Sequence, residues 1–325
     1  MRAMMSESPG GPESLKLMEL PSKPLGKGQV RINVKAAGVN FPDTLIIADK
    51  YQFKPPRPFA PGHEVAGAVT EVAGDVKEYK VGDRVIAAIG HGGYATEVVA
   101  DQGQLLPMPS NMSYEDGAAF TMTYGTSYYA LKQRSSYQPG ETLLVTGASG
   151  GVGLTAVELG ALLGLKVIAA VGSDEKMEIC RKYGATMFVN YSKEKMRDKV
   201  KELTGGNGAD IIYDAVGGDA LDESVRCINW YGRLLVVGFA AGRIPQLPAN
   251  LALLKSCDVR GIFYGAWRAR EPKEARRNFD DMLWWYAQGK LKPHVSMRFP
   301  LEKSAEAMNA LLSRKATGKV VLTMA

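Results

Sequence analysis

Two hydrophobic patterns divide the chain and predict two kinds of structure. Through the first hundred residues, short β-rich runs alternate with Gly, Pro and Asp turns. These runs read GQVRINVKAAGVN, HEVAGAVTEVAGD, VGDRVIAAIG and GGYATEVVA. Short runs with this spacing are typical of strands joined by tight turns. The pattern predicts a small, twisted, mostly antiparallel β domain.

From Leu143 onward, nearly continuous apolar runs alternate with helical patterns. The predicted strands are LLVTG, KVIAA, TMFVN, DIIYDAV, RLLVVGF and VRGIF. Helical spacing covers Asp174 to Tyr183, Glu194 to Leu203 and Leu221 to Trp230. Strands buried on both faces lose their alternation, and strand–helix repeats build parallel sheets. The fold class is therefore α/β, with a doubly wound parallel sheet following the β domain.

The ends of the α/β segment follow from helix signals. Ser113 and Asp116 form a capping-box signature ahead of AAFTMTYGTSYYALKQ, which places a boundary near Thr123. Pro272 opens an amphipathic helix that Gly289 ends. The tail then predicts one more helix and a closing strand that completes the first domain. We expect one domain from residues 1–122 and 268–325, and a dinucleotide-binding domain from 123–267.

The stretch LLVTGASGGVG, from Leu143 to Gly153, predicts a strand, a glycine turn and a helix. Gly147, Gly150 and Gly153 stand where a pyrophosphate loop needs residues without a Cβ. The anion then meets free N–H groups at a helix N-terminus. Ser149, Gly151 and Val152 complete the predicted contacts of this loop.

The end of the second α/β strand predicts which dinucleotide binds. An NAD site places a carboxylate there for the ribose 2′-hydroxyl. This chain has Val171, Gly172 and Ser173 instead, followed by Lys176. Asp174 and Glu175 are explained as first-turn helix residues that interact favourably with the helix dipole. Lys176 is either a contact to a 2′-phosphate or a solvated helix lysine.

Composition excludes several classes of protein. Of the 325 residues, 46% are hydrophobic and 23% charged, which is typical of a globular enzyme. No apolar run is long enough to span a membrane and no signal-peptide pattern opens the chain, so we expect a cytoplasmic protein. Three separated cysteines in apolar surroundings suit buried thiols. The net charge of +6 is spread without a basic run, so nucleic-acid binding is not expected.

Five strings in register resemble a known family over nearly the whole chain. They are GVNFPDTL, FAPGHEVAGAV, VGDRV, TGASGGVG and GKVVL. Together they resemble the zinc-independent medium-chain dehydrogenase/reductases, and most closely their NADPH:quinone oxidoreductase group related to zeta-crystallin. The resemblance implies a Rossmann domain, a GroES-like catalytic domain and NADPH as cofactor.

The resemblance also implies site residues. Lys176 and Tyr191 would hold the adenosine 2′-phosphate, and Ser173 lies beside them. Asn40 and Asp43 would lie beside the nicotinamide, and Tyr51 would close over the substrate. Thr126, Gly238 and Phe239 would line the cofactor cleft. From sequence position alone, Asn40 could equally be a turn residue and Tyr51 an ordinary loop aromatic.

Zinc-dependent relatives have a cysteine where Asn40 stands. This chain keeps the GHE string at His63 and Glu64 but has no cysteine before Cys180, so neither zinc site of those relatives can be assembled. His63 is predicted to be a hydrogen-bonded structural histidine. His91 and His294 lack neighbours at ligand spacing. We expect no metal.

These observations predict an NADPH-dependent reductase that passes hydride to a quinone or similar electron-poor acceptor in an interdomain cleft. An enoyl-thioester or alkenal reductase is the alternative enzyme. A structural or RNA-binding, NADPH-binding crystallin-like protein is the alternative of another class. The sixth apolar strand, VRGIFYG, would be an exposed sheet edge, which predicts a homodimer through that edge.

Overall fold

The computed structural model describes residues 1–324 and contains two compact units. Unit 1 comprises Met1–Met122 and the chain from Leu283 onward, and unit 2 comprises Thr123–Met282. Unit 2 therefore includes residues 268–282, which the sequence analysis had placed in the other domain. The assignment of functional domains stays a prediction.

Unit 1 is built on a largely antiparallel sheet. Its strands lie in the order β14-β15-β3-β4-β5-β7, and β6 also pairs with β3. Their bounds are β3 Gln29–Val39, β4 Glu64–Val72, β5 Arg84–Ala88, β6 Glu97–Asp101, β7 Leu105–Pro107, β14 Val295–Pro300 and β15 Lys319–Thr323. The closing strand β15 pairs antiparallel with β3, with Val320 opposite Val39. This pairing joins the tail of the chain to the sheet of unit 1.

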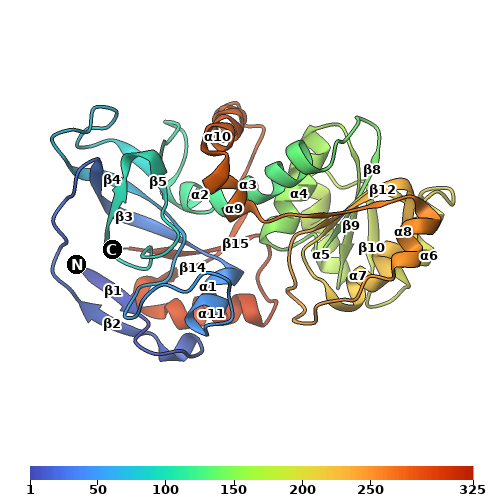
Figure 1. Ribbon diagram of the computed structural model, residues 1–325, viewed down its shortest axis with the longest axis horizontal. Coiled ribbons are helices and arrows are strands. Elements are labelled where there is room, and N and C mark those ends of the chain that lie inside the picture. The colour runs from blue at the N-terminus through green and yellow to red at the C-terminus, as the bar shows by residue number, and fades with distance from the viewer. Residues whose placement is uncertain (325) are drawn as a thin grey trace. The chain divides into compact units, whose positions relative to one another are not determined.

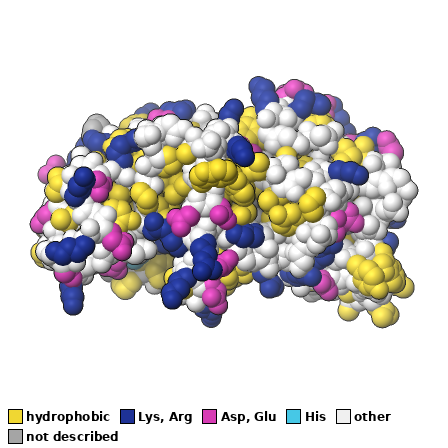
Figure 2. All heavy atoms as spheres, turned by 90° about the horizontal axis from the view of Figure 1, so that it is seen from above, with side chains coloured by type: hydrophobic (Ala, Val, Ile, Leu, Met, Phe, Trp, Pro, Cys, Tyr) yellow, Lys and Arg dark blue, Asp and Glu magenta, His cyan; other side chains and the backbone are white. Residues whose placement is uncertain are grey.

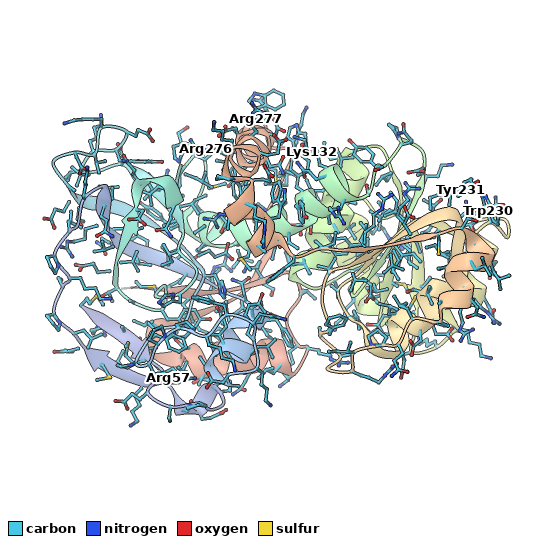
Figure 3. The ribbon with its side chains drawn as sticks, viewed as in Figure 1. Arg57, Lys132, Trp230, Tyr231, Arg276 and Arg277 are labelled. Atoms are coloured by element: carbon cyan, nitrogen blue, oxygen red, sulfur yellow. The ribbon has the colours of Figure 1, made fainter. Side chains whose placement is uncertain are left out.

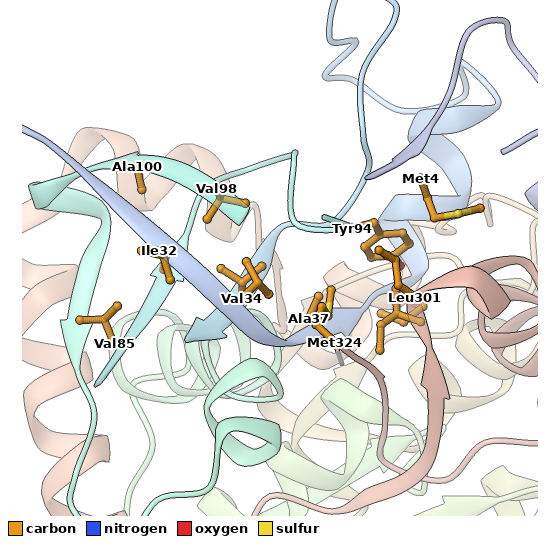
Figure 4. Packing of buried hydrophobic residues seen from close by; sticks show 14 of the residues in the cluster. Met4, Ile32, Val34, Ala37, Val85, Tyr94, Val98, Ala100, Leu301 and Met324 are labelled. Atoms are coloured by element: carbon orange, nitrogen blue, oxygen red, sulfur yellow. The ribbon is translucent and has the colours of Figure 1, made fainter. Parts of the chain in front are cut away.

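The core of unit 1 gathers around the long strand β3. Alternate residues of β3, among them Ile32 and Val34, are fully buried. Figure 4 shows them packed with side chains from other strands, and Tyr94 lying in the same core near Met4 and Leu301. Because successive side chains of a strand point to opposite faces, the alternation seen in the sequence becomes a one-sided core.

The remaining elements of unit 1 surround this sheet. Two short strands at the N-terminus, β1 Arg2–Met5 and β2 Lys16–Glu19, pair antiparallel with each other. The sequence analysis did not predict this pair. The helices are α1 Phe41–Ile47, α2 Tyr114–Ala118 and α11 Ser304–Leu312. Ser113 caps α2 by accepting a hydrogen bond from the Asp116 N–H, as its signature predicts.

Unit 2 contains a six-stranded parallel sheet in the order β10-β9-β8-β11-β12-β13. Figure 1 labels β8, β9, β10 and β12 of this sheet, with helices around it. The strands are β8 Thr142–Thr146, β9 Lys166–Val171, β10 Met187–Asn190, β11 Ala209–Asp214, β12 Ile228–Val236 and β13 Asp258–Gly261. All six match predicted strands. Counted along the chain, the third, second and first strands are followed by the fourth, fifth and sixth, which is the Rossmann order. The predicted fold class is confirmed.

Helices connect the strands of unit 2. Their bounds are α3 Thr121–Tyr129, α4 Gly151–Leu162, α5 Asp174–Lys182, α6 Met196–Leu203, α7 Gly218–Ser224, α8 Ala249–Lys255, α9 Tyr264–Arg270 and α10 Pro272–Ala287, where α3 and α10 each run across a unit boundary. The three cysteines are buried free thiols, as expected. No helix within residues 1–324 has both the length and the apolar character to cross a membrane.

One predicted element is wrong. Helical spacing had suggested a helix from Leu221 to Trp230, but α7 ends at Ser224 and β12 already begins at Ile228. Ile228 pairs with Ala209 of β11, so sheet pairing overrides the local spacing. Trp230 and Tyr231 are exposed neighbours near the start of this strand (Figure 3).

Candidate functional site

The glycine turn of unit 2 has the geometry that close approach to an anion requires. It connects β8 to α4, as predicted. Gly147 has a φ of 61°, in the left-handed region that favours glycine. A Cβ on Gly153 would lie 2.2 Å from the Gly147 carbonyl oxygen, so the helix can seat on the turn only without a side chain there. The first turn of α4 contains no acidic residue, which leaves its positive dipole end uncompensated.

Loops from neighbouring strands meet beside this turn. The Val216 side chain reaches within 2.8 Å of where a Cβ on Gly147 would stand, and the Phe239 ring is equally close to that position on Gly217. Gly238 donates its N–H to the Asp214 carbonyl at 3.3 Å. The strand order of the sheet reverses between β8 and β11. Open α/β sheets bind their ligands at such a reversal.

Buried Asp214 fixes two of these loops. Its carboxylate accepts hydrogen bonds from the Thr146 hydroxyl at 2.5 Å and from the Gly217 N–H at 2.8 Å. Burial raises the pKa of this carboxyl, and the two hydrogen bonds partly offset the effect. Sequence analysis did not single out Asp214, Val216 or Gly217. The acidic end of the string DIIYD was its only signal.

The end of β9 shows why its nearby acid is not free to hold a ribose. Asp174 binds the Lys193 ammonium at 2.5 Å and the Asn190 amide at 2.6 Å. These two hydrogen bonds lower the pKa of the exposed Asp174 carboxyl. The Tyr191 ring lies against Gly172, 3.3 Å from where a Cβ would stand. Tyr191 therefore borders the turn at Gly172, and its contact with a 2′-phosphate stays a prediction.

The other predicted cofactor residues of unit 2 lie near the same elements. Lys176 is in the first turn of α5, which Ser173 precedes. Thr126 is buried in α3, next to Ser127. The Ser127 hydroxyl is 2.8 Å from that of Thr155 in α4 and donates to the Val152 carbonyl at 2.9 Å. These bonds hold the α3 segment that contains Thr126 against the helix of the glycine turn. Contact of any of these residues with a cofactor stays a prediction.

In unit 1, two of the three predicted catalytic residues belong to one buried polar network. Asp43, with no exposed surface, accepts hydrogen bonds from the Asn40 N–H at 2.8 Å and from the Tyr94 hydroxyl at 3.1 Å. Its second oxygen is 2.6 Å from His63 Nδ1. This contact confirms that His63 is hydrogen-bonded. Burial, and then the charge of Asp43, raises the pKa of Tyr94 well above its usual range.

A buried ion pair continues this network. Lys319 Nζ lies 2.8 Å from Glu64 Oε1 and donates to Asn40 Oδ1 at 2.7 Å. Glu64 also accepts from the Asn40 amide at 3.0 Å, and its other oxygen accepts from the Thr121 hydroxyl and the Met122 N–H. Both oxygens of this buried carboxylate are thus bonded, as a buried charge requires. The Asn40 side chain has a partner on each atom, which fixes the orientation of its amide.

Tyr51 stands at the edge of the network. Its ring packs against the unit 1 core, and its pKa is raised by burial and then by the charge of Asp43.

Sequence analysis missed Lys319, Tyr94 and Thr121. The string GKVVL contains Lys319 and was used for the resemblance, but nothing in it reveals a partner 255 residues away.

A zinc ligand set is not present among residues 1–324. In this described part of the chain, no three or more His, Cys, Asp or Glu side chains are grouped so that they could hold a metal ion. Where zinc-dependent relatives have a cysteine, this chain has Asn40, whose amide is already bonded on both atoms. The histidine nearby, His63, is bonded through Nδ1. This donor set does not fit the thiolate and imidazole ligands that zinc prefers.

A Rossmann sheet with a pyrophosphate-type turn, accompanied by a largely antiparallel domain, defines a two-domain dinucleotide-dependent oxidoreductase. Two family models match the chain. "Alcohol dehydrogenase GroES-like domain" covers residues 26–110, and "Zinc-binding dehydrogenase" covers residues 151–281.

Similar proteins narrow the class. The "Quinone oxidoreductase-like protein 2 homolog" of Nematostella vectensis is 45% identical over 92% of this chain and 82% of its own. The Escherichia coli quinone oxidoreductase complexed with NADPH superposes with a TM-score of 0.93, at 30% identity, over 99% of this chain and all of that one. The CurF ER cyclopropanase of the curacin A biosynthetic pathway gives a TM-score of 0.90 at 27% identity, over all of this chain and 99% of that one. The chain belongs to the quinone oxidoreductase group of the medium-chain dehydrogenases/reductases.

Proposed function

We propose that this protein transfers hydride from NADPH to a quinone or a similarly electron-poor acceptor without a metal. The observation that carries the proposal is the pairing of a pyrophosphate-type turn at Gly147–Gly153 with a β9 end whose nearest acid is already bonded. A cofactor with a 2′-phosphate suits this place better than one with a free 2′-hydroxyl. The Escherichia coli relative, whose structure was solved in complex with NADPH, supports the same choice.

The residues of unit 2 would bind and orient the cofactor. The N–H groups at the start of α4 would receive the pyrophosphate, with Ser149, Gly150, Gly151 and Val152 around it. Ser173, Lys176 and Tyr191 would surround the 2′-phosphate, and Thr126, Gly238 and Phe239 would position the remainder. When bound, NADPH supplies the hydride from its nicotinamide ring.

The residues of unit 1 would act on the nicotinamide and the acceptor. Asn40, whose amide is fixed by Glu64 and Lys319, would position the nicotinamide. Asp43 would keep the local backbone and its hydrogen-bond partners in place, and Tyr51 would close over the acceptor. Holding hydride donor and acceptor in a reactive orientation supplies much of the rate in such reactions.

The quinone class rests on the names of the relatives, and an α,β-unsaturated thioester or alkenal is the alternative acceptor. The same fold is found in a protein named a cyclopropanase, so the fold alone does not select the acceptor. No observation favours a structural or RNA-binding role. On the face shown in Figure 2, basic side chains are interspersed with acidic ones.

The test is NADPH oxidation against a panel of quinones, enones and enoyl thioesters, with NADH run in parallel. We expect turnover with quinones to exceed turnover with enoyl thioesters, and NADPH to be preferred over NADH. Preferred reduction of an enoyl thioester would replace the quinone by the alternative. If no acceptor of any class is reduced while AU-rich RNA shifts in a gel, the proposed enzymatic role is wrong.

A further inference from the structure

The contact between Asp43 and His63 leaves the second nitrogen of the histidine available for chemistry. His63 Nδ1 lies 2.6 Å from an oxygen of Asp43, which is fully buried, whereas the His63 side chain retains 11% of its exposure. Within residues 1–324, Nε2 has no hydrogen-bond partner, yet it is not among the buried polar atoms that lack one. Nε2 therefore reaches solvent while Nδ1 is held.

Among the groups bonded to the Asp43 carboxylate, His63 is the one whose side chain can take up and release a proton. The other groups bonded to the Asp43 carboxylate are the neutral Asn40 N–H and the neutral Tyr94 hydroxyl. The nearby cation, Lys319, is bonded to Glu64 and Asn40 instead. The Asp43 carboxylate holds a proton on Nδ1, as in other aspartate–histidine pairs, so Nε2 is the nitrogen through which His63 exchanges a proton with its surroundings. Protonated His63 has an N–H at Nε2 that can be donated.

The surroundings of His63 suit a flat aromatic guest. His91 lies close enough for the His63 charge to contribute, after burial and before Lys23, to the lowered pKa of His91. The His91 ring is 5.8 Å from the ring of Phe53 and 6.1 Å from that of Phe59. Phe53 is 46% exposed, so this aromatic group opens outward. The exposed face of Phe53 can receive the ring of an acceptor by stacking.

We propose that His63, oriented by Asp43, is the group that binds the acceptor oxygen and protonates it during reduction. This inference rests on the proposed function and adds the residue that completes it. In the reaction, the hydride carries two electrons from NADPH to the acceptor and leaves NADP⁺. The reduced acceptor bears its negative charge on oxygen. The Nε2 proton moves to that oxygen, neutral His63 remains, and solvent restores the proton.

Tyr51 is a weaker candidate for this task. Its raised pKa makes the phenol a poorer acid than an ordinary tyrosine, and the Asp43 charge opposes its ionisation.

The first test compares the kcat of His63→Gln with that of wild type. The acceptors form a series in which the oxygen of the reduced product becomes steadily more basic. A positioned acid contributes about 10²- to 10⁴-fold, and most where the product oxygen is basic. We expect kcat to fall about 100-fold or more for an enone and only a few-fold for a highly electron-poor quinone. NADPH affinity, from fluorescence titration, should stay unchanged. His294→Gln is the matched control, because His294 is hydrogen-bonded to Thr317 elsewhere in unit 1.

The second test needs no turnover. 4-Nitrophenol imitates the reduced acceptor and changes its absorption when it ionises. At a pH below the pKa of free 4-nitrophenol, we expect wild type to bind 4-nitrophenol as the phenolate. This should hold with and without NADP⁺. His63→Gln should not do so, and Asp43→Asn should bind it mostly as the neutral phenol. This readout separates the inference from the proposed function, since it is independent of NADPH oxidation.

Several outcomes would overturn the proposal. An equal loss of kcat for every acceptor, or a parallel loss of NADPH affinity, would show that His63 only maintains structure. Unchanged kcat with the enone, or equal phenolate binding by wild type and His63→Gln, would show that Nε2 does not contact the acceptor. If wild type reduces no acceptor but binds the phenolate through His63, the proposed function is wrong. The inference that His63 binds a negatively charged oxygen would still hold.

Discussion

At the scale of single residues, functional side chains are fixed by partners that are distant in sequence. The Asn40 amide donates to Glu64, 24 residues on, and accepts from Lys319, 279 residues on. The strings that mark Asn40, Glu64 and Lys319 are each short and local. Sequence analysis could therefore name Asn40 as a site residue, but it could not show that both atoms of its amide are already bonded.

Lys176→Ala tests whether Lys176 binds the 2′-phosphate of the cofactor. A lysine bonded to a phosphate contributes about 1.5–3 kcal/mol, so the substitution should weaken NADPH binding about 10- to 100-fold and leave NADH binding nearly unchanged. Dissociation constants from fluorescence titration measure both. Lys182→Ala, at the exposed end of the same helix, is the control and should change neither. Equal weakening of NADPH and NADH would show that Lys176 does not contact the 2′-phosphate.

Tyr51→Phe tests whether the phenol supplies a proton. Because burial and Asp43 raise its pKa, the hydroxyl stays protonated through neutral and mildly alkaline pH and has no ionisation to contribute there. With a quinone, KM should rise through lost contacts, while kcat stays within about five-fold and the shape of its pH profile is unchanged. A fall in kcat of about 100-fold with normal NADPH binding would make Tyr51 the general acid instead.

At the scale of elements, the sequence predicted most of what local pattern controls. All six strands of the parallel sheet were recognised, because buried strands read as apolar runs between glycine turns. The pair β1–β2 was missed, because four residues are too few to show a period. Leu221–Trp230 was misread because pairing of Ile228 with β11, a long-range contact, decides where the strand begins.

The network that ties β15 to β4 and α1 was beyond sequence analysis for the same reason. Lys319 of β15 meets Glu64 of β4 only because β3 lies between them and pairs with both strands. Gly38 of β3 is needed at this place, since a Cβ there would lie 2.2 Å from the Ala118 carbonyl oxygen and 2.6 Å from Glu64. Nothing in the sequence links a closely packed glycine in β3 with a lysine at the start of β15.

Lys319→Met should destabilise the protein strongly. It leaves the fully buried Glu64 carboxylate without its cation, at a cost of about 3–5 kcal/mol. Chemical denaturation measures the change. Lys303→Met, which breaks an exposed pair with Glu306, should cost about 1 kcal/mol or less. Adding Glu64→Gln to Lys319→Met should restore part of the loss, and failure to do so would show that the charge of Glu64 is not what the lysine compensates.

At the scale of the whole molecule, the exposed edge of the parallel sheet is the feature left to explain. β13 pairs with β12 on one side and is the last strand of its sheet. Val259 in this strand is 47% exposed, and Phe263 just beyond it is 54% exposed. An open edge with apolar side chains invites pairing with another copy, and a two-fold axis would let one β13 pair antiparallel with the other. We therefore propose a homodimer through β13.

Light scattering at micromolar concentration should then give about twice the 35.1 kDa mass of the chain. Val259→Lys should shift the mass toward the monomer, because a two-fold axis brings the two new charges close together at a desolvated edge. Leu17→Lys is the matched control: Leu17 is 43% exposed in β2 of unit 1, so it loses a comparable apolar surface without touching the edge. A monomeric wild type would exclude the dimer. A dimer that Val259→Lys leaves intact would place the interface elsewhere, and the open edge of β13 would then need another partner.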